Sequence, residues 1–406
     1  MQIKIVPKTI YRSLLSIVLA AAFFVAGFFV SHYYTALYSA VELLNPFVES
    51  GKIINKPLLT YSIKNLQTRE YIPSNITLES VISEEETYTS FLFSYTTLGK
   101  KMTGQINIPD TITANPEQEK QVILLLRGYV PQEIYTTGTG TKNAAATLAQ
   151  AGYITVAPDF FGFGGSDPEP KDTWQARFEK PITVIELIAS LEKNGVPLNL
   201  ESQRTNNSFD SDLITVSDIG IWAHSNGGQI ALTTLEVLQK PIPTTLWAPV
   251  TAPFPYSVLY FSDELADEGK EQRKWISLFE DDYDVFDFSL TQHLESLTGP
   301  IQIQHGTADD AALIYWSQEF VTKVTAENKR RVDASKELDV IAATTSAREA
   351  SATAQKTTSD SGLSDSQLLP AIEINLITYP NTNHNMVPSW DTAIQRDLQF
   401  FAKWLK

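Results

Sequence analysis

The sequence predicts an α/β fold with a mostly parallel central sheet and helices on both faces. The first observation is a set of continuous apolar runs that end at Gly, Pro or polar residues, as in strands buried on both faces. The second is that these runs alternate with helical patterns, which implies β–α–β units. The third is size, because 406 residues with 43% hydrophobic content suffice for one large domain with additions.

The expected elements follow in order along the chain. Two antiparallel strands come first, because two alternating segments flank a Gly-containing turn. A Pro at the start and a Gly past the end then bound a helix at 181–195. The expected strands are 87–97, 101–110, 122–129, 153–160, 219–225, 244–250, 301–310 and 372–380. The other expected helices are 143–152, 227–240, one around 315–324, and 391–406.

Two segments interrupt this alternation within the domain expected at 61–406. Residues 253–298 are rich in aromatic and charged side chains and lie between two strands, so they are expected to form a small cap over the sheet. Residues 333–366 are rich in Ala, Ser and Thr and contain few large apolar groups. Such a composition predicts a flexible, partly helical insertion that adds no core.

The N-terminal segment predicts a membrane anchor. Lys4, Lys8 and Arg12 precede the uncharged apolar run 14–30, which nearly spans a hydrocarbon core of about 30 Å. A cleaved signal peptide is the alternative, but bulky residues occupy the position three before each plausible cut. We therefore expect residues 1–31 to form a cytoplasmic basic end and a single transmembrane helix. Residues 32–60 would connect it to an extracytoplasmic domain, which would be secreted if the segment were cleaved.

Charge and cysteine content exclude several classes of function. The chain has 47 acidic and 31 basic residues and a net charge of −16, which opposes binding to nucleic acid. It has no cysteine, so disulfides, thiolate metal sites and cysteine nucleophiles are excluded. The oligomeric state stays open.

Ser225 is the first candidate for a catalytic group. It lies in "GIWAHSNGGQI" (220–230), between an expected strand and an expected helix. It is either a helix N-cap or a nucleophile on a tight strand-to-helix turn. Such a turn needs small neighbours, and Ala223 and Gly227 flank the serine two residues away. We expect the turn to tolerate the one methyl group of Ala223, with Gly227 making the tighter contact.

A nucleophilic serine needs a base and an orienting carboxylate. His384 is the best candidate base, because it follows the last expected strand in a polar loop. Asp309 or its neighbour Asp310, after the strand at 301–310, would orient it, and we prefer Asp309. The chain order is then Ser, Asp, His, as expected of α/β-hydrolases. The four remaining histidines are assigned to the anchor, to packing, to the cap and to strand structure, and they are His32, His224, His293 and His305.

The oxyanion formed during attack on a carbonyl would need two backbone donors. One is the N–H of Asn226, which follows the serine at a helix N-terminus. The other is most plausibly the N–H of Tyr129, since Gly128 lets the chain approach closely. The Tyr129 ring would line the pocket.

Six motifs carry a family resemblance: "RGYVPQEIYTT", "AGYITVAPDFFGFGGSD", "IWAHSNGG", "APFPYSVLY", "HGTADD" and "YPNTNHNMVPSW". From about Tyr61 to the C-terminus the chain resembles the catalytic domain of prolyl-oligopeptidase-like and dienelactone-hydrolase-like α/β-hydrolases. The resemblance implies the α/β-hydrolase fold and no metal or organic cofactor. It also implies a nucleophile, an acid, a base and two oxyanion donors, which are Ser225, Asp309, His384, Tyr129 and Asn226.

The chain departs from the family pattern at three points. Arg127 stands where many relatives have His, Ala223 replaces a Gly, and no β-propeller precedes the hydrolase segment. The last point disfavours strict oligopeptidase action and favours an esterase.

The function expected from the sequence is a membrane-anchored serine hydrolase acting through an acyl-enzyme on a small-molecule or peptide substrate. A prolyl-oligopeptidase-like peptidase and a carboxylesterase are both consistent with the motifs. A catalytically inactive binding module is the alternative from another class. Haloalkane or epoxide chemistry is disfavoured because it needs an Asp in place of Ser225. Aromatic residues of the cap suggest an apolar acyl or leaving group, although a cap core would have the same composition.

Overall fold

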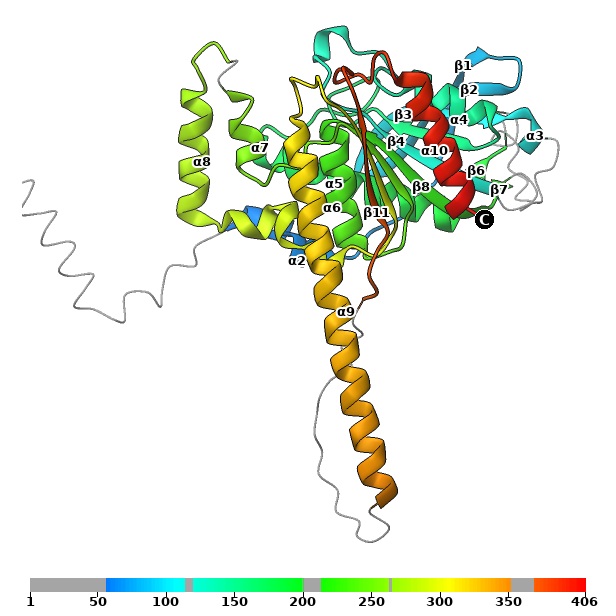
Figure 1. Cartoon of the computed structure of the whole chain (residues 1–406). Helices are drawn as coiled ribbons and strands as arrows, with labels where there is room; N and C mark the ends of the chain where they lie inside the picture. The colour runs from blue at the N-terminus through cyan, green and yellow to red at the C-terminus, as the bar shows by residue number, and fades with distance from the viewer. Residues whose placement is uncertain (1–55, 114–119, 199, 201–212, 263–264, 352–368) are drawn as a thin grey trace, which may run out of the picture. The chain divides into compact units, whose positions relative to one another are not determined.

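The computed structural model describes residues 56–113, 120–198, 200, 213–262, 265–351 and 369–406 (Figure 1). The predicted anchor at 14–30 and most of the predicted connector at 32–60 lie outside these described residues. None of the helices in the described ranges is long and apolar enough to cross a membrane. A 3₁₀ helix, η2 (Pro57–Tyr61), and a short helix, α2 (Ile63–Gln67), precede the sheet.

Within the described residues, nine strands form one sheet in the order β1-β2-β3-β5-β4-β8-β9-β10-β11. The six strands from β5 to β11 in this order are parallel, whereas β1, β2 and β3 pair antiparallel at one edge, and β3 is antiparallel to β5. The mostly parallel sheet expected from the sequence is therefore confirmed. The strands are β1 (Thr77–Glu84), β2 (Tyr88–Thr97), β3 (Lys100–Pro109), β4 (Lys120–Leu126), β5 (Ile154–Pro158), β8 (Val216–His224), β9 (Thr244–Trp247), β10 (Ile301–Gly306) and β11 (Ile374–Tyr379). A separate small sheet pairs β6 (Val196–Pro197) with β7 (Leu213–Ile214).

Alternation along the central strand β4 divides the core into two layers. Val122, Leu124 and Leu126 pack with α5 (Thr173–Asn194), α6 (Asn226–Leu238) and the start of α9 (Ile314–Ser351). Ile123 and Leu125 point to the other face, where α4 (Lys142–Gln150) and α10 (Trp390–Trp404) cover the sheet. Successive side chains of a strand point to opposite faces, so a continuous apolar run requires helices on both faces, as Figure 1 shows.

Two sequence predictions were wrong in detail. The helix expected to start at Pro181 begins at Thr173, with Pro181 inside it. Asp172 caps this earlier start by accepting a hydrogen bond from the backbone N–H of Gln175 at 2.8 Å. The edge strand β1 was not predicted, because its side chains are mostly exposed and give no apolar alternation.

The segment 253–298 contains α7 (Tyr256–Leu259) and α8 (Lys270–Asp282). Its aromatic residues Phe254 and Phe279 are buried against Trp174 and Phe178 at the start of α5. This packing explains why α5 begins earlier than its Pro suggests. It also shows that much of the aromatic content of this segment forms a core of its own.

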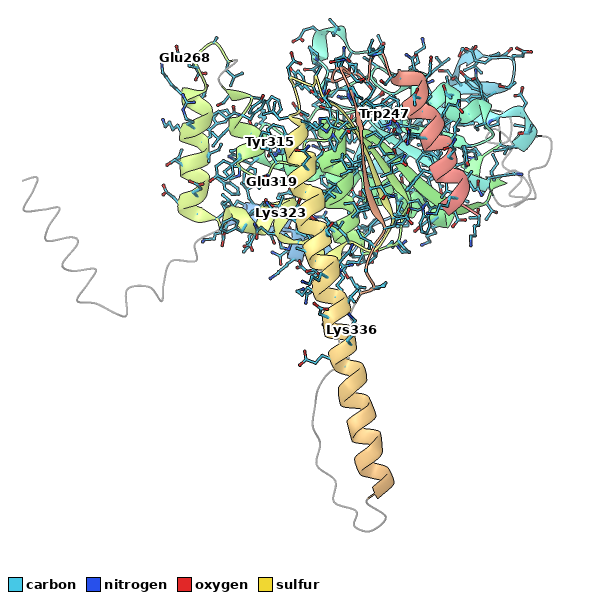
Figure 2. The ribbon with its side chains drawn as sticks, viewed as in Figure 1. Trp247, Glu268, Tyr315, Glu319, Lys323 and Lys336 are labelled. Atoms are coloured by element: carbon cyan, nitrogen blue, oxygen red, sulfur yellow. The ribbon has the colours of Figure 1, made fainter. Side chains whose placement is uncertain are left out.

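Helix α9 (Ile314–Ser351) is the longest described element, with 38 residues. It packs on the sheet near its start, where Phe320 and Val324 are buried, and Figure 1 shows it extending well beyond the sheet. Figure 2 shows Tyr315, Glu319 and Lys323 at successive turns of its first half. Residues 333–351 of the predicted insertion belong to this helix, and 352–368 lie outside the described residues.

A buried carboxylate joins the last helix to the sheet. Asp397 of α10 accepts hydrogen bonds from five side chains on β8, β9 and β10, which are Trp222, Thr245, Trp247, Gln302 and Gln304. Trp247, labelled in Figure 2, donates its Nε1 hydrogen at 2.7 Å. Burial raises the pKa of Asp397 to about 7, although four of these donors, all but Gln302, act in the opposite direction. This network fixes α10 against strands β8, β9 and β10.

Candidate active site

Ser225 lies on a strained turn between the central strand β8 and helix α6. Its φ of 55° and ψ of −121° are rare for a residue with a side chain. Backbone hydrogen bonds hold this conformation: the Ser225 N–H donates to Trp247 O at 2.9 Å, and Ser225 O accepts from Gly228 and Val250. Ser225 occupies the N-cap position, but its hydroxyl makes no capping hydrogen bond. Capping therefore does not explain the serine.

The neighbours of the turn match the steric prediction. A Cβ on Gly227 would lie 2.1 Å from the backbone oxygen of Leu126, a distance that no side chain can adopt. Ala223 is fully buried, and its methyl group is accommodated in the core. The expectation that Gly227 makes the tighter contact is confirmed. A Cβ on Gly128 would lie 2.9 Å from Ser225 Cβ, so the loop after β4 approaches the serine directly.

Asp309 and His384 form a hydrogen-bonded pair at the ends of β10 and β11. The His384 Nδ1 atom lies 2.9 Å from Asp309 Oδ2 and 3.1 Å from Oδ1. Asp309 is buried, and its Oδ1 also accepts from the backbone N–H groups of Ala311 and Ala312, both at 2.9 Å. Asp310 is exposed. The structure thus brings Asp309, and not Asp310, to the histidine.

The loops that carry this pair approach each other at Gly306. A Cβ on Gly306 would lie 2.0 Å from the backbone oxygen of Thr382, so the contact requires glycine. The Ala308 N–H donates to the same oxygen at 3.0 Å. Parallel neighbouring strands end at the same edge, and this contact locks their loops together.

His305 is a second histidine on Asp309, which the sequence interpretation had assigned to strand structure. Its Nε2 lies 3.1 Å from Asp309 Oδ2 and 2.8 Å from Ala312 O, and its Nδ1 lies 2.9 Å from Ser317 Oγ. Two acceptors at Nε2 place a hydrogen there, so Nδ1 accepts from the serine. Burial alone would raise the pKa of Asp309, but the hydrogen bonds from His305 and His384 together hold it well below the usual value. The four-residue spacing of His305 and Asp309 was the available sequence signal.

His224 supports the base from its other side. Its Nε2 lies 2.9 Å from the backbone oxygen of His384, and the centroids of the two rings are 4.7 Å apart. Burial, followed by repulsion from His384, lowers the pKa of His224 to about 4, so the ring is neutral at pH 7 and Nε2 is the donor. The sequence interpretation expected His224 to pack away from the site, and this was wrong. Because His224 precedes Ser225, its contact also places His384 beside the turn.

The groups facing the reacting position are left without partners. Ser225 Oγ and His384 Nε2 make no hydrogen bond within the described part of the chain. Bonds between a nucleophile and its base often tighten only when substrate is bound. The backbone N–H groups of Tyr129 and Asn226 also have no acceptor among the described residues. The Tyr129 side chain is 79% exposed, and its expected place in the lining of a substrate pocket stays a prediction.

Arg127 fixes the loop that carries Tyr129. Its guanidinium donates to Gly128 O at 3.0 Å and to Asp159 O at 2.9 Å. It is also stacked between aromatic rings, with its central carbon 4.1 Å from the Phe163 centroid and 4.5 Å from that of Tyr135. Burial lowers the pKa of Arg127. Arg127, which departs from the family pattern, therefore holds the loop that carries Tyr129 in place.

A pocket of about 340 Å³ lies beside the turn, between α5, α6 and the segment containing α8. Asn226 and Gln229 line it from the start of α6, and Trp275 lines it from α8. Its connection to the site is Asn226, since Ser225 and His384 are not among its lining residues. Of the aromatic residues of this segment, Trp275 and Phe288 line the pocket, whereas Phe254 and Phe279 pack against each other. No group of three or more His, Asp or Glu side chains in the described ranges could hold a metal ion.

The fold and this arrangement define the class. A mostly parallel sheet with a serine on a strained strand-to-helix turn, followed by Asp and His after later strands, is the α/β-hydrolase fold.

Comparisons with known proteins find similar solved structures but no sequence relative. No family model matches the chain, and no curated protein sequence matches it. The chain is similar to Est1E from Butyrivibrio proteoclasticus, solved with ferulic acid (14% identity, 76% of this chain and 98% of that one, TM-score 0.46). It is also similar to acetyl xylan esterase 1 from Thermoanaerobacterium sp. JW/SL YS485 (12%, 85% and 94%, 0.49). A third is an S-formylglutathione hydrolase from Agrobacterium tumefaciens (16%, 81% and 100%, 0.45). At these similarities the substrate has to be inferred from the site.

Proposed function

We propose that the protein is a serine hydrolase that cleaves carboxylic esters. Ser225 attacks the ester carbonyl while His384 takes its proton, and Asp309 stabilises the resulting imidazolium. The N–H groups of Tyr129 and Asn226 stabilise the oxyanion. The imidazolium then protonates the departing alcohol, and a water molecule, deprotonated by His384, hydrolyses the acyl-enzyme and frees the serine.

The observation that carries this proposal is the strained backbone of Ser225, whose hydroxyl has no structural task. Backbone strain persists where the surrounding structure enforces it, and it clusters at functional sites. The Asp309–His384 pair at neighbouring strand ends supplies the base that such a serine needs.

The pocket favours a small ester over a peptide. Its volume of about 340 Å³ is at the small end of the roughly 300–1,000 Å³ typical of small-molecule sites. A peptidase that cleaves amides stays a prediction from the family resemblance, as does anchoring in a membrane through residues 14–30.

Covalent labelling tests the proposal. A fluorophosphonate probe should modify Ser225, located by mass spectrometry of the labelled peptide, and Ser225→Ala should abolish labelling and lower ester turnover by about 10³-fold or more. Ser217→Ala, at an exposed serine of the same strand, is the matched control. A folded protein that is not labelled would be the inactive binding module. Faster turnover of Pro- or Ala-linked p-nitroanilides than of p-nitrophenyl esters would favour the peptidase.

A further inference from the structure

The pocket beside Ser225 carries a charge opposite to that of the whole chain. Its lining includes three basic residues, Lys171, Arg177 and Lys180, and one acidic residue, Glu169. The chain as a whole has a net charge of −16. A local excess of positive charge in such a chain attracts anions into the pocket.

Arg177 is partly buried and has no carboxylate partner among the described residues. Its Nη2 donates to two neutral groups, Gln229 Oε1 at 2.7 Å and Ser257 Oγ at 3.4 Å. Its Nε is buried and makes no hydrogen bond. Burial lowers the pKa of Arg177 to about 10. A buried cation with an unused donor is costly unless an anion reaches it.

Lys180 adds a second cation on the same side of α5, three residues further along the helix. Its backbone oxygen accepts from Thr183 Oγ1, but its ammonium group has neither a hydrogen bond nor an ion pair among the described residues. Burial, and after it the charges of Arg177 and Arg127, lower the pKa of Lys180 to about 8, although Glu169 acts in the opposite direction. Two neighbouring cations are therefore held together with insufficient opposing charge.

We propose that Arg177 and Lys180 bind a carboxylate of the substrate, so that the enzyme prefers esters with a free carboxylate remote from the cleaved bond. A guanidinium matches a carboxylate in shape and charge, and the lysine adds a point charge. The inference rests on the proposed function of Ser225 as the nucleophile. Helix α6 begins next to Ser225 and carries Gln229, the partner of Arg177, one turn further along. A substrate carboxylate at the cations would thus leave its ester group toward the serine.

Arg177 also has a purely structural explanation, since it connects α5 to α6 and to α7 through Gln229 and Ser257. Lys180 makes no such connection, so it is the residue to change. Lys193, exposed on the same helix and about 20 Å further along it, is the matched control.

The test compares two substrates that differ in one charge, mono-p-nitrophenyl adipate and the p-nitrophenyl ester of adipic acid monoamide. The expected kcat/KM ratio of acid to amide is about tenfold at low ionic strength, since hydrogen bonds to charged groups are the strong ones. Lys180→Gln should lower the ratio by about threefold, because Arg177 still offers its charge, whereas Lys180→Arg should retain it. Lys193→Gln should leave it unchanged. If Lys180→Gln fails to fold, the folded Lys180→Arg variant is used to answer the same question. Its acid-to-amide ratio of kcat/KM should be lost in 0.5 M salt, which screens the charge.

The pH dependence gives an independent check. Lys180 loses its charge as pH rises through about 8, so the ratio should fall between pH 7 and pH 9. The ratio cancels the titration of groups that act equally on both substrates.

The outcomes separate the two proposals. Hydrolysis of both esters at equal rates, unaffected by Lys180→Gln, would overturn the carboxylate site and leave the hydrolase intact. Absence of hydrolysis and of Ser225 labelling would overturn the hydrolase. In that case the carboxylate site is tested by calorimetry with adipate. The site requires that adipate binds to the native protein and binds at least tenfold more weakly to Lys180→Gln.

Discussion

The two sides of Ser225 differ in how their polar groups are satisfied. On the base side, Asp309 accepts hydrogen bonds from two histidines and two backbone N–H groups, and His384 is held through both its ring and its carbonyl oxygen. On the pocket side, Arg177 and Lys180 are partly buried, and no carboxylate of the described residues is in hydrogen-bonding contact with either side chain.

The two groups of residues differ because the partners of the base belong to the protein, whereas the partner of the cations would come with the substrate. A catalytic base has to be oriented before the reaction, so its hydrogen bonds are built into the fold. A binding cation has to meet a partner that comes with the substrate, so the fold leaves it open and bears a desolvation cost. Polar groups with all their hydrogen bonds formed therefore indicate a catalytic role near Ser225, and cations without a counter-charge indicate a role in binding.

The largest effect is expected from Asp309→Asn. An amide cannot stabilise the imidazolium of His384, and its NH₂ group would face donors from His305 and Ala312. The value of kcat for p-nitrophenyl esters should fall by about 10³–10⁴-fold. Steady-state kinetics on protein verified as folded by circular dichroism measure this.

Asp310→Asn is the matched control, because it makes the same chemical change at the exposed neighbour. It should alter kcat by less than about threefold. Equal losses in the two variants would contradict the assignment of Asp309 as the orienting acid.

A smaller effect is expected from His305→Leu, which removes one donor to Asp309. We expect kcat to fall by about tenfold with KM unchanged, since a hydrogen bond to a charged group contributes about 1.5–3 kcal/mol. His305→Gln keeps an N–H donor and should restore most of the loss. A change in KM rather than kcat, or no rescue by Gln, would show that His305 only supports packing.

The sequence predicted the parts of the site that depend on chain order and local sterics. Ser225, Asp309 and His384 each follow a buried strand, and parallel strands bring such positions to one edge. The tight contact of Gly227 followed from the geometry of the turn. These inferences needed no knowledge of packing between distant segments.

The sequence did not reveal contacts made across elements. His224 is adjacent to Ser225 in the chain, but its ring bond to His384 spans 160 residues. Arg177 and Lys180 lie in the part of α5 that was not predicted as helical, because Pro181 was taken as the helix start. The contacts of Arg177 are made by Gln229 of α6 and Ser257 of α7, whose positions beside α5 only the fold determines.

The smallest effect is expected from Gln229→Glu, which would remove the contrast between the two sides. The new carboxylate would stand where Gln229 Oε1 accepts from Arg177 at 2.7 Å, and it would supply the counter-charge that the pocket lacks. The acid-to-amide ratio of kcat/KM should fall by about threefold, because Lys180 still offers its charge. Gln318→Glu, on an exposed position of α9, adds the same charge elsewhere and should leave the ratio unchanged. A new carboxylate at position 229 neutralises Arg177 and repels an anionic substrate. If Gln229→Glu instead raised the preference for the acid substrate, the unpaired cations Arg177 and Lys180 would not be the groups that select the acid.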